Sequence, residues 1–270
     1  MTEDSRDRRL ADLELSLRAA ELLASTGLET VRELMALPRL VLPGAWPRKV
    51  AKLVAAEIDE VFETVFQETG EEFAGEIVLP PPKEAELRAE GDVPARMRTI
   101  DSWLAQHFPQ LLAELNPPAS KEAIAAAEAD LGCVLPDDYK QFLAIHDGQQ
   151  EASPMVRYGA LLRVSELADA RRGIFNEETP IDPESAGPGV RPVSYCERWI
   201  PIGRSARGRD FLCIDLDPAP GGVVGQIIEF VVDFDERPLV ARSFADLLSL
   251  YFEQVQTGEI DLEAAMEDRD

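Results

Sequence analysis

Apolar residues recur with helical spacing in the first seventy residues. Between residues 10 and 36 they form one face of two short predicted helices joined at Ser25-Thr26-Gly27, where Gly27 suits a left-handed cap. Thr30 and Glu33 have the spacing of a capping box, which starts the second helix. An apolar stripe then predicts a third helix from about Arg48 to Gln67. The pattern therefore predicts a small all-helical N-terminal domain over residues 1–69.

The helical pattern is lost after Gly70. The composition shifts to Glu and Pro, with three successive prolines at residues 80–82, which predicts a linker over residues 70–94. The sequence leaves two alternatives for this linker. It either lets the flanking domains move independently, or it is pinned by its apolar side chains Phe73, Ile77, Val78 and Leu79.

The second half begins with helical stripes and then changes to short strands. Three stripes cover residues 100–115, 124–131 and 139–146. Strands are predicted at residues 155–162, 199–202, 211–216 and 226–234, with a short helix at 164–170 and a Pro/Gly loop at 177–192. Ser243 suits the N-cap of a closing helix, Phe244 to Gln256. This order predicts an α+β domain over residues 95–257 with a mainly antiparallel sheet packed by helices, followed by an acidic tail at 258–270.

Charge narrows the classes of function. The chain has 27 Lys and Arg against 51 Asp and Glu, a net charge of −24. Residues 1–70 contain 9 basic and 13 acidic residues, a net −4, so the remainder carries −20. Nucleic acid and anionic membranes repel such a chain, because binding to phosphates depends on Lys and Arg. A basic protein partner is attracted instead.

The cysteine pattern indicates the compartment. Three cysteines without CxxC spacing, together with no visible signal peptide or membrane anchor, predict a cytoplasmic protein. The two histidines, His107 and His146, lie 39 residues apart at predicted helix ends, which excludes a His-rich metal site. We assign no catalytic residue, no cofactor and no metal ligand.

One glycine- and arginine-rich segment has the composition of a phosphate-binding loop. Gly203 to Gly208 lacks the Gly-Lys-Ser/Thr ending, however, and no helix follows it. We interpret it as the connection between two strands of a hairpin.

Five carboxylates lie at predicted strand ends: Asp215, Asp217, Asp233, Asp235 and Glu236. At the strand period, Asp215 and Asp217 project from the same face about 7 Å apart. A solvated acidic sheet face, a site for a hard cation and a docking surface for a basic partner all fit this pattern. We take the five residues as candidate partner-binding residues.

The ordered motifs of the second half carry a family resemblance. They are Leu135-Pro136-Asp137-Asp138-Tyr139-Lys140, His146-Asp147-Gly148-Gln149, Trp199-Ile200-Pro201-Ile202-Gly203, Phe211-Leu212-Cys213-Ile214-Asp215 and Ala241-Arg242-Ser243-Phe244. In this order they resemble the SMI1/KNR4 family, also called the SUKH superfamily, over residues 100–256. The resemblance implies an α+β protein-interaction domain. Such domains act in bacteria as immunity proteins that neutralise toxins, often nucleases, and in fungi they are linked to cell-wall assembly and signalling.

A shorter resemblance concerns residues 10–67. Leu13-Glu14-Leu15-Ser16-Leu17-Arg18 and Gly27-Leu28-Glu29-Thr30-Val31 resemble the C-terminal domain of the bacterial RNA polymerase alpha subunit, which has helix-hairpin-helix character. The resemblance implies a DNA contact by Arg18, and we take the basic residues Arg48 and Lys49 as further candidates for phosphate contacts. Glu21 stands where that family has asparagine, and Trp46-Pro47-Arg48-Lys49 replaces its Gly-Lys loop.

The leading hypothesis is a non-enzymatic cytoplasmic protein-binding module, acting either as a scaffold or regulator or as an immunity protein against a basic toxin such as a nuclease. The alternative is a DNA- or RNA-polymerase-associated regulator that uses the N-terminal domain on DNA. An enzyme or carboxylate-metal protein is the third class, and it rests on Asp215, Asp217 and Asp233 alone.

Overall fold

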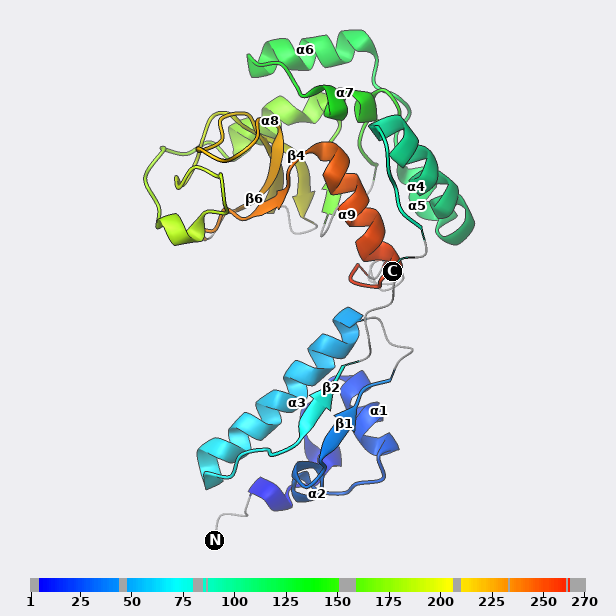
Figure 1. Cartoon of the computed structure of the whole chain (residues 1–270), viewed down its shortest axis with the longest axis vertical. Coiled ribbons are helices and arrows are strands. Elements are labelled where there is room, and N and C mark those ends of the chain that lie inside the picture. The colour runs from blue at the N-terminus through cyan, green and yellow to red at the C-terminus, as the bar shows by residue number, and fades with distance from the viewer. Residues whose placement is uncertain are drawn as a thin grey trace. The chain divides into compact units, whose positions relative to one another are not determined.

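The structure is a computed structural model that describes residues 5–43, 48–79, 85, 87–150, 159–205, 210–232, 234–260 and 262. The chain divides into two compact units (Figure 1). Unit 1 comprises Met1–Glu84 with Gln256–Asp261, and unit 2 comprises Ala85–Val255 with Leu262–Asp270.

Unit 1 is mainly helical, as the hydrophobic pattern predicts. Its helices are α1 (Leu17–Ser25), α2 (Val31–Met35) and α3 (Arg48–Thr69), preceded by short 3-10 turns at Ser5–Asp7 and Leu10–Asp12. The predicted capping box is present: Thr30 Oγ1 accepts from the Glu33 amide, and the Glu33 carboxylate accepts from the Thr30 amide. Gly27 has a φ of +72°, which confirms the left-handed cap after α1.

Two short strands, which the pattern does not predict, complete unit 1. Strand β1 (Arg39–Val41) pairs in parallel with β2 (Glu76–Val78), which lies inside the predicted linker. Phe73 stacks on Phe62 of α3 with ring centroids 4.1 Å apart, and Ile77 and Leu79 pack against the core of the unit. Residues 73–79 are therefore pinned to unit 1 rather than free. The domain boundaries themselves stay a prediction.

Unit 2 is an α+β domain, as predicted. Among the described residues, five strands form one antiparallel sheet in the order β3-β4-β5-β6-β7. They are β3 (Gly159–Leu161), β4 (Trp199–Ser205), β5 (Asp210–Asp215), β6 (Gln226–Val231) and β7 (Leu239–Ala241). The antiparallel pairing of β4 with β5 confirms the hairpin interpretation, although residues 206–209 lie outside the described residues. The sequence pattern does not predict β7.

The helices of unit 2 are α4 (Val93–His107), α5 (Pro109–Glu114), α6 (Lys121–Leu131), α7 (Asp137–Leu143), α8 (Leu167–Gly173) and α9 (Phe244–Gln256). Their ends follow local chemistry. Ser120 caps α6 by accepting from the Ala123 amide, and Gly132 ends it with a φ of +63°. No described helix combines the length and apolar composition that crossing a bilayer requires.

The antiparallel sheet has two different faces. The register places Ile200, Ile214 and Ile227 side by side on one face, where all three are fully buried; we call it the helix face. On the other, which we call the loop face, Phe211 lies opposite Phe230 and Cys213 opposite Ile228. Figure 1 shows α9 on one side of the sheet and the long connection between α8 and β4 on the other. Residues of that connection, among them Val190, Tyr195 and Cys196, pack against the loop face.

Candidate docking site

The connection after α8 leaves one end of the loop face uncovered. A groove of about 650 Å³ lies there between α8 and the turn that joins β6 to β7. Phe211 and Phe230, paired across β5 and β6, line it from the sheet. Ile174 and Phe175 line it from the end of α8, and Val232 lines it from the turn. We call this feature the α8 groove.

The α8 wall of the groove is oriented by a buried anchor. Ile174 follows the last residue of α8 and is buried in the cluster that contains Trp199, so the next residue is directed outward. Phe175 is 72% exposed, and its ring meets Tyr195 edge-on at 5.5 Å between centroids. This edge-on contact holds the Phe175 ring in place, although most of the side chain is exposed to solvent.

The β6–β7 turn is held by a buried arginine. Arg237 is only 3% exposed, and its guanidinium lies 4.3 Å from the centre of the Phe230 ring. Its donors reach the backbone carbonyl oxygens of Val231, Phe234, Glu236 and Ser194, at 2.6 to 3.2 Å. Burial lowers the pKa of this guanidinium, and the nearby Asp235 opposes that shift. Because charged hydrogen bonds are strong in a buried setting, Arg237 ties the described carbonyls of this turn to the segment around Ser194.

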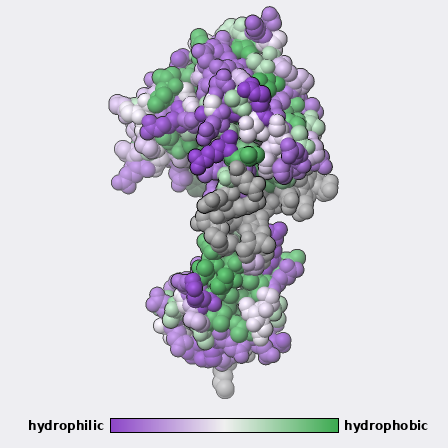
Figure 2. Space-filling view, turned by 45° about the vertical axis from the view of Figure 1, so that its right-hand side comes forward, coloured by the Kyte–Doolittle hydropathy of each residue, from purple (hydrophilic) through white to green (hydrophobic). Residues whose placement is uncertain are grey.

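That turn presents apolar side chains to solvent. Phe234 is 64% exposed and Val232 47% exposed, close in sequence to each other and to the groove-lining Asp235. Figure 2 shows one face of unit 2 as mostly hydrophilic with separate hydrophobic patches. Exposed apolar groups gathered at a groove mark interaction sites more often than singly exposed ones do.

Acidic side chains frame the groove. Glu166 and Asp169 line it from the α8 side, and Asp235 lines it from the turn. Asp169 is paired with Arg172. Arg204 also lines the groove, because an irregularity in β4 between Pro201 and Gly203 shifts the register and places Arg204 opposite Phe211 on the loop face.

The structure separates the five predicted partner-binding carboxylates. Asp235 and Glu236 are exposed in the β6–β7 turn, as a docking surface requires. Asp233 lies outside the described residues. Asp217 is exposed but follows the other end of β5, at the opposite end of the sheet from Asp235. The acidic residues at the two ends of the sheet therefore do not form one cluster.

The position of Asp215 shows that the prediction of a solvated acidic sheet face is wrong for this residue. It is fully buried, and its carboxylate accepts from Gln226 Nε2 and from the Asp217 amide, both at 2.9 Å. Burial raises its pKa, while the Asp217 and Gln226 hydrogen bonds act in the opposite direction. Asp215 is thus an internal acceptor that organises the start of β6, and it does not reach a partner. Among the described residues, no three His, Cys, Asp or Glu side chains gather as a metal site requires.

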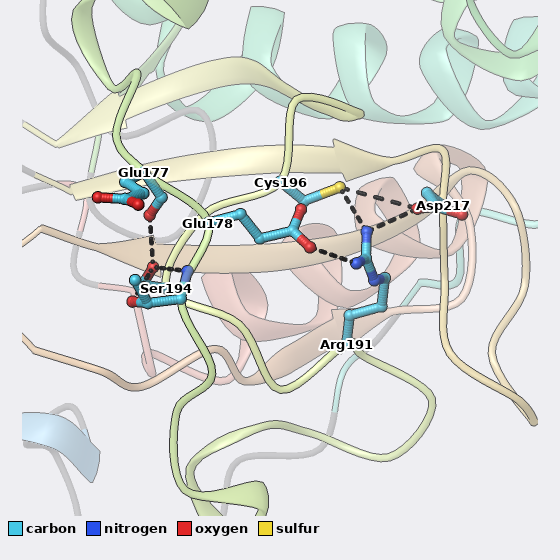
Figure 3. A network of polar contacts seen from close by, with 7 residues as sticks. Glu177, Glu178, Arg191, Ser194, Cys196 and Asp217 are labelled. Carbon is cyan, nitrogen blue, oxygen red and sulfur yellow. Dashed lines mark hydrogen bonds and ion pairs between the residues drawn. The ribbon is translucent and has the colours of Figure 1, made fainter.

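A second polar network fastens the connection that covers the loop face (Figure 3). Arg191 donates to Asp217 at 2.7 Å and to Glu178 at 2.6 Å, and its Nη1 lies 3.3 Å from Cys196 Sγ. Ser194 Oγ donates to the carbonyl of Glu177 at 3.0 Å. Cys196 is buried, and burial raises its pKa, so the thiol is not poised as a nucleophile. We interpret the network as a fastening of the loop rather than as a reactive centre.

The residues with predicted nucleic-acid contacts lie in unit 1. Arg18 is exposed in the first turn of α1. Arg48 and Lys49 begin α3, and their side chains lie outside the described residues. The DNA contact stays a prediction.

Sequence reasoning missed the groove residues Phe175, Arg204 and Arg237, and Phe234, which lies next to the groove-lining Asp235. A signal for the two phenylalanines does exist: Phe175 lies outside any predicted stripe, Phe234 is the last residue of a predicted strand, and acidic residues follow each within two positions. Arg237 carries no comparable signal: three of its carbonyl partners lie within six residues of it, but its contact with Ser194, 43 residues away, forms only in the folded structure.

Comparison with known proteins gives the relatives of this chain. Residues 118–250 match the model of the SMI1 / KNR4 family (SUKH-1). The cell wall biosynthesis/cell cycle regulator smi1 of Schizosaccharomyces pombe is 29% identical over 204 residues, which cover 68% of this chain and 38% of that protein. The glucan synthesis regulatory protein of Neurospora crassa is 28% identical over 200 residues, 59% of this chain and 37% of that protein.

The cell wall assembly regulator SMI1 of Saccharomyces cerevisiae is 27% identical over 202 residues, 60% of this chain and 40% of that protein. The chain thus spans well under half the length of these relatives. The match confirms the resemblance drawn from the motifs of the second half. The resemblance of residues 10–67 to the RNA polymerase alpha subunit stays a prediction.

Proposed function

We propose that unit 2 is a non-enzymatic docking domain for a basic protein partner. The premise is the match of residues 118–250 to the SMI1/KNR4 (SUKH-1) family. Its role is that of a regulator or scaffold. The relatives described above are named as regulators, which supports this class of function. The α8 groove is the proposed docking site.

One observation carries this proposal: Phe175, Val232 and Phe234 are exposed on a surface that is already held in shape. Aromatic residues at well-packed positions supply most of the binding energy in protein interfaces. Tyr195 supports Phe175, and Arg237 binds the backbone carbonyls of Val231 and Phe234, which lowers the conformational entropy lost on binding.

The chemistry of the described side chains also supports a binding role. Nucleophilic catalysis requires an activated nucleophile beside a base. Cys196 and Cys213 are buried, and burial raises the pKa of both thiols. Cys133, Cys196 and Cys213 are all free thiols, for which we propose the reducing cytoplasm as the compartment.

Toxin immunity is the narrower version of the same proposal. A net charge of −20 beyond residue 70 favours fast association with a basic protein such as a nuclease, because long-range attraction steers the encounter. A toxin gene adjacent to the gene of this chain would favour immunity over scaffolding.

Capture of partners from the native cell extract tests the docking site. The wild-type chain is compared with the double variant Phe175→Asp/Phe234→Asp and with a matched control, Val134→Asp/Val224→Asp, whose two side chains are 69% and 67% exposed elsewhere in unit 2. We expect the same partner with the wild type and the control and its loss with the groove variant.

Equal capture by all three proteins would show that the groove is not the docking site. Failure of the wild type to retain any protein, when an unrelated bait succeeds, would reject the protein-binding function. Thermal unfolding of each variant checks that all three remain folded.

The alternative function, a DNA-associated regulator, has the exposed Arg18 in its favour. It predicts salt-dependent DNA binding by the full chain that weakens on Arg18→Ala, with a smaller salt slope. Absence of DNA affinity at low salt would remove it.

A further inference from the structure

The floor of the α8 groove is apolar and built for a large side chain. Phe211 and Phe230 lie directly opposite each other on paired strands, and Ile174 borders them from the end of α8. Phe175 extends this apolar surface to the rim. A volume of about 650 Å³ exceeds what one aromatic side chain fills, so part of the backbone that carries it also enters.

The rim of the groove is acidic on both walls. Glu166 stands at the start of α8 and Asp235 in the facing β6–β7 turn. Glu177 and Glu236, each exposed, extend the same charge beyond the groove in the two segments that border it. Carboxylates on opposite walls favour cations on both sides of an apolar anchor.

The two arginines that line the groove differ in what they present. Arg237 is buried, donates to four backbone carbonyl oxygens and lies over the face of Phe230, so its guanidinium is engaged inside the protein. Arg204 is exposed at the β4 side of the groove. Among the described residues that line the groove, three exposed carboxylates, Glu166, Asp169 and Asp235, therefore outnumber the one exposed arginine.

We propose that the α8 groove binds an extended segment of a partner protein in which a large apolar side chain enters the groove and Lys or Arg residues on both sides of it meet Glu166 and Asp235. This inference rests on the docking function proposed above and adds the chemistry of the occupant. Arg237 acts as a positioning residue, because it holds the wall that carries Asp235.

Other occupants fit the groove less well. A second copy of the chain brings another net charge of −24, which opposes association. A small anionic molecule meets Glu166 and Asp235 at the rim. A cationic segment with an apolar anchor matches both the apolar floor and the carboxylates of the rim.

Three designed peptides test this chemistry on the full chain. Each is a short soluble peptide with a fluorescent label: one has a central Trp flanked by three Lys on each side, one replaces the Trp by Ala, and one replaces the Lys by Glu. Fluorescence anisotropy measures each affinity. We expect the Lys/Trp peptide to bind about tenfold more tightly than either matched peptide, with an affinity that falls as salt rises.

Variants of the chain locate the binding. Glu166→Gln/Asp235→Asn removes two charges from the rim, and Glu122→Gln/Asp130→Asn removes two exposed charges from α6 as a matched control. We expect the rim variant to weaken binding of the Lys/Trp peptide about fivefold and the control to change it by less than about twofold. Phe175→Asp/Phe234→Asp is expected to abolish the preference for Trp over Ala.

Equal loss in the rim and α6 variants would overturn the inference, since it would show attraction to net charge alone. Equal binding of the Trp and Ala peptides, or tighter binding of the Glu peptide, would also overturn it. So would sedimentation showing a wild-type dimer that Phe175→Asp/Phe234→Asp dissociates, because the occupant would then be a second copy. If these results appear while the capture experiment still finds a groove-dependent partner, the docking function stands and only the chemistry of the occupant is wrong.

Discussion

The two faces of the antiparallel sheet of unit 2 differ in the kinds of side chain that they bury. On the helix face, Ile200, Ile214 and Ile227 line up across three strands, all fully buried and all apolar. On the loop face, the same strands bury apolar residues together with the polar residues Asp215 and Gln226, which lie opposite each other. One face is therefore uniform, and the other is mixed.

The covering element explains the difference. A helix satisfies its own backbone groups, so a face covered by helices needs only apolar side chains. An irregular connection has backbone groups that need partners, and buried side chains of the sheet supply them. Gln226 Nε2 donates to the carbonyl of Gly189, and Arg237 donates to that of Ser194. The groove occurs where the connection no longer covers the loop face.

Removal of Arg237 has the largest expected effect. Arg237→Met leaves four carbonyl oxygens without their charged donor, so we expect the free energy of unfolding to fall by about 3–5 kcal/mol. Urea unfolding measures it. Arg242→Met, at an exposed arginine, should change stability by less than about 0.5 kcal/mol. A loss no greater than that of the control would show that the arginine does not hold the turn.

A truncation on the helix face should come next. Ile214→Ala removes apolar groups from a fully buried site and leaves a cavity, which we expect to cost about 3 kcal/mol in urea unfolding. Val224→Ala, at an exposed position, provides the comparison and should be close to neutral. Similar values for both would mean that the helix face is not closely packed.

Asp215→Asn separates charge from hydrogen bonding on the loop face. Because burial raises the folded-state pKa of Asp215 above the ordinary value of 3.8, the folded protein binds this proton more tightly than the unfolded chain does. The wild type should therefore be most stable relative to Asp215→Asn below pH 3.8, and it should lose that advantage as the pH rises through the folded pKa. Unfolding measured from pH 3 to pH 7 checks the direction, and the opposite trend would contradict the burial of a carboxylate.

Arg191 should give the smallest change. Its partners Glu178 and Asp217 are about half exposed, so we expect Arg191→Gln to cost only about 0.5–1 kcal/mol, and less at high salt. Hydrogen exchange of the Thr179 and Ser194 amides, which are bonded across the connection, should quicken in the variant. Unchanged exchange would mean that the loop is held without this ion pair.

Much of the helical structure could be predicted from the sequence, because each helix end depends on residues within one turn. The capping box at Thr30 and Glu33, the left-handed caps at Gly27 and Gly132 and the closing helix Phe244–Gln256 are examples. The short strands β1, β2 and β7 were harder to predict, since three residues carry too little periodicity and their pairing partners lie elsewhere in the chain.

The candidate site could be predicted only in part. Asp235 and Glu236 were identified by charge, whereas Asp215 has the same residue type in a similar pattern and is buried. A period of two assigns residues to a face, but it does not say which face a loop will cover.

The sequence by itself determined the division of charge, the helices with their caps and the family resemblance of the second half, because these depend on composition, local spacing and ordered motifs. Tertiary structure alone decided that the irregularity in β4 turns Arg204 toward the groove and that Asp215 becomes an internal acceptor. It also decided that Arg237 reaches a carbonyl 43 residues away. These features depend on register and on contacts between distant segments, which form only when the sheet and its covering loop come together.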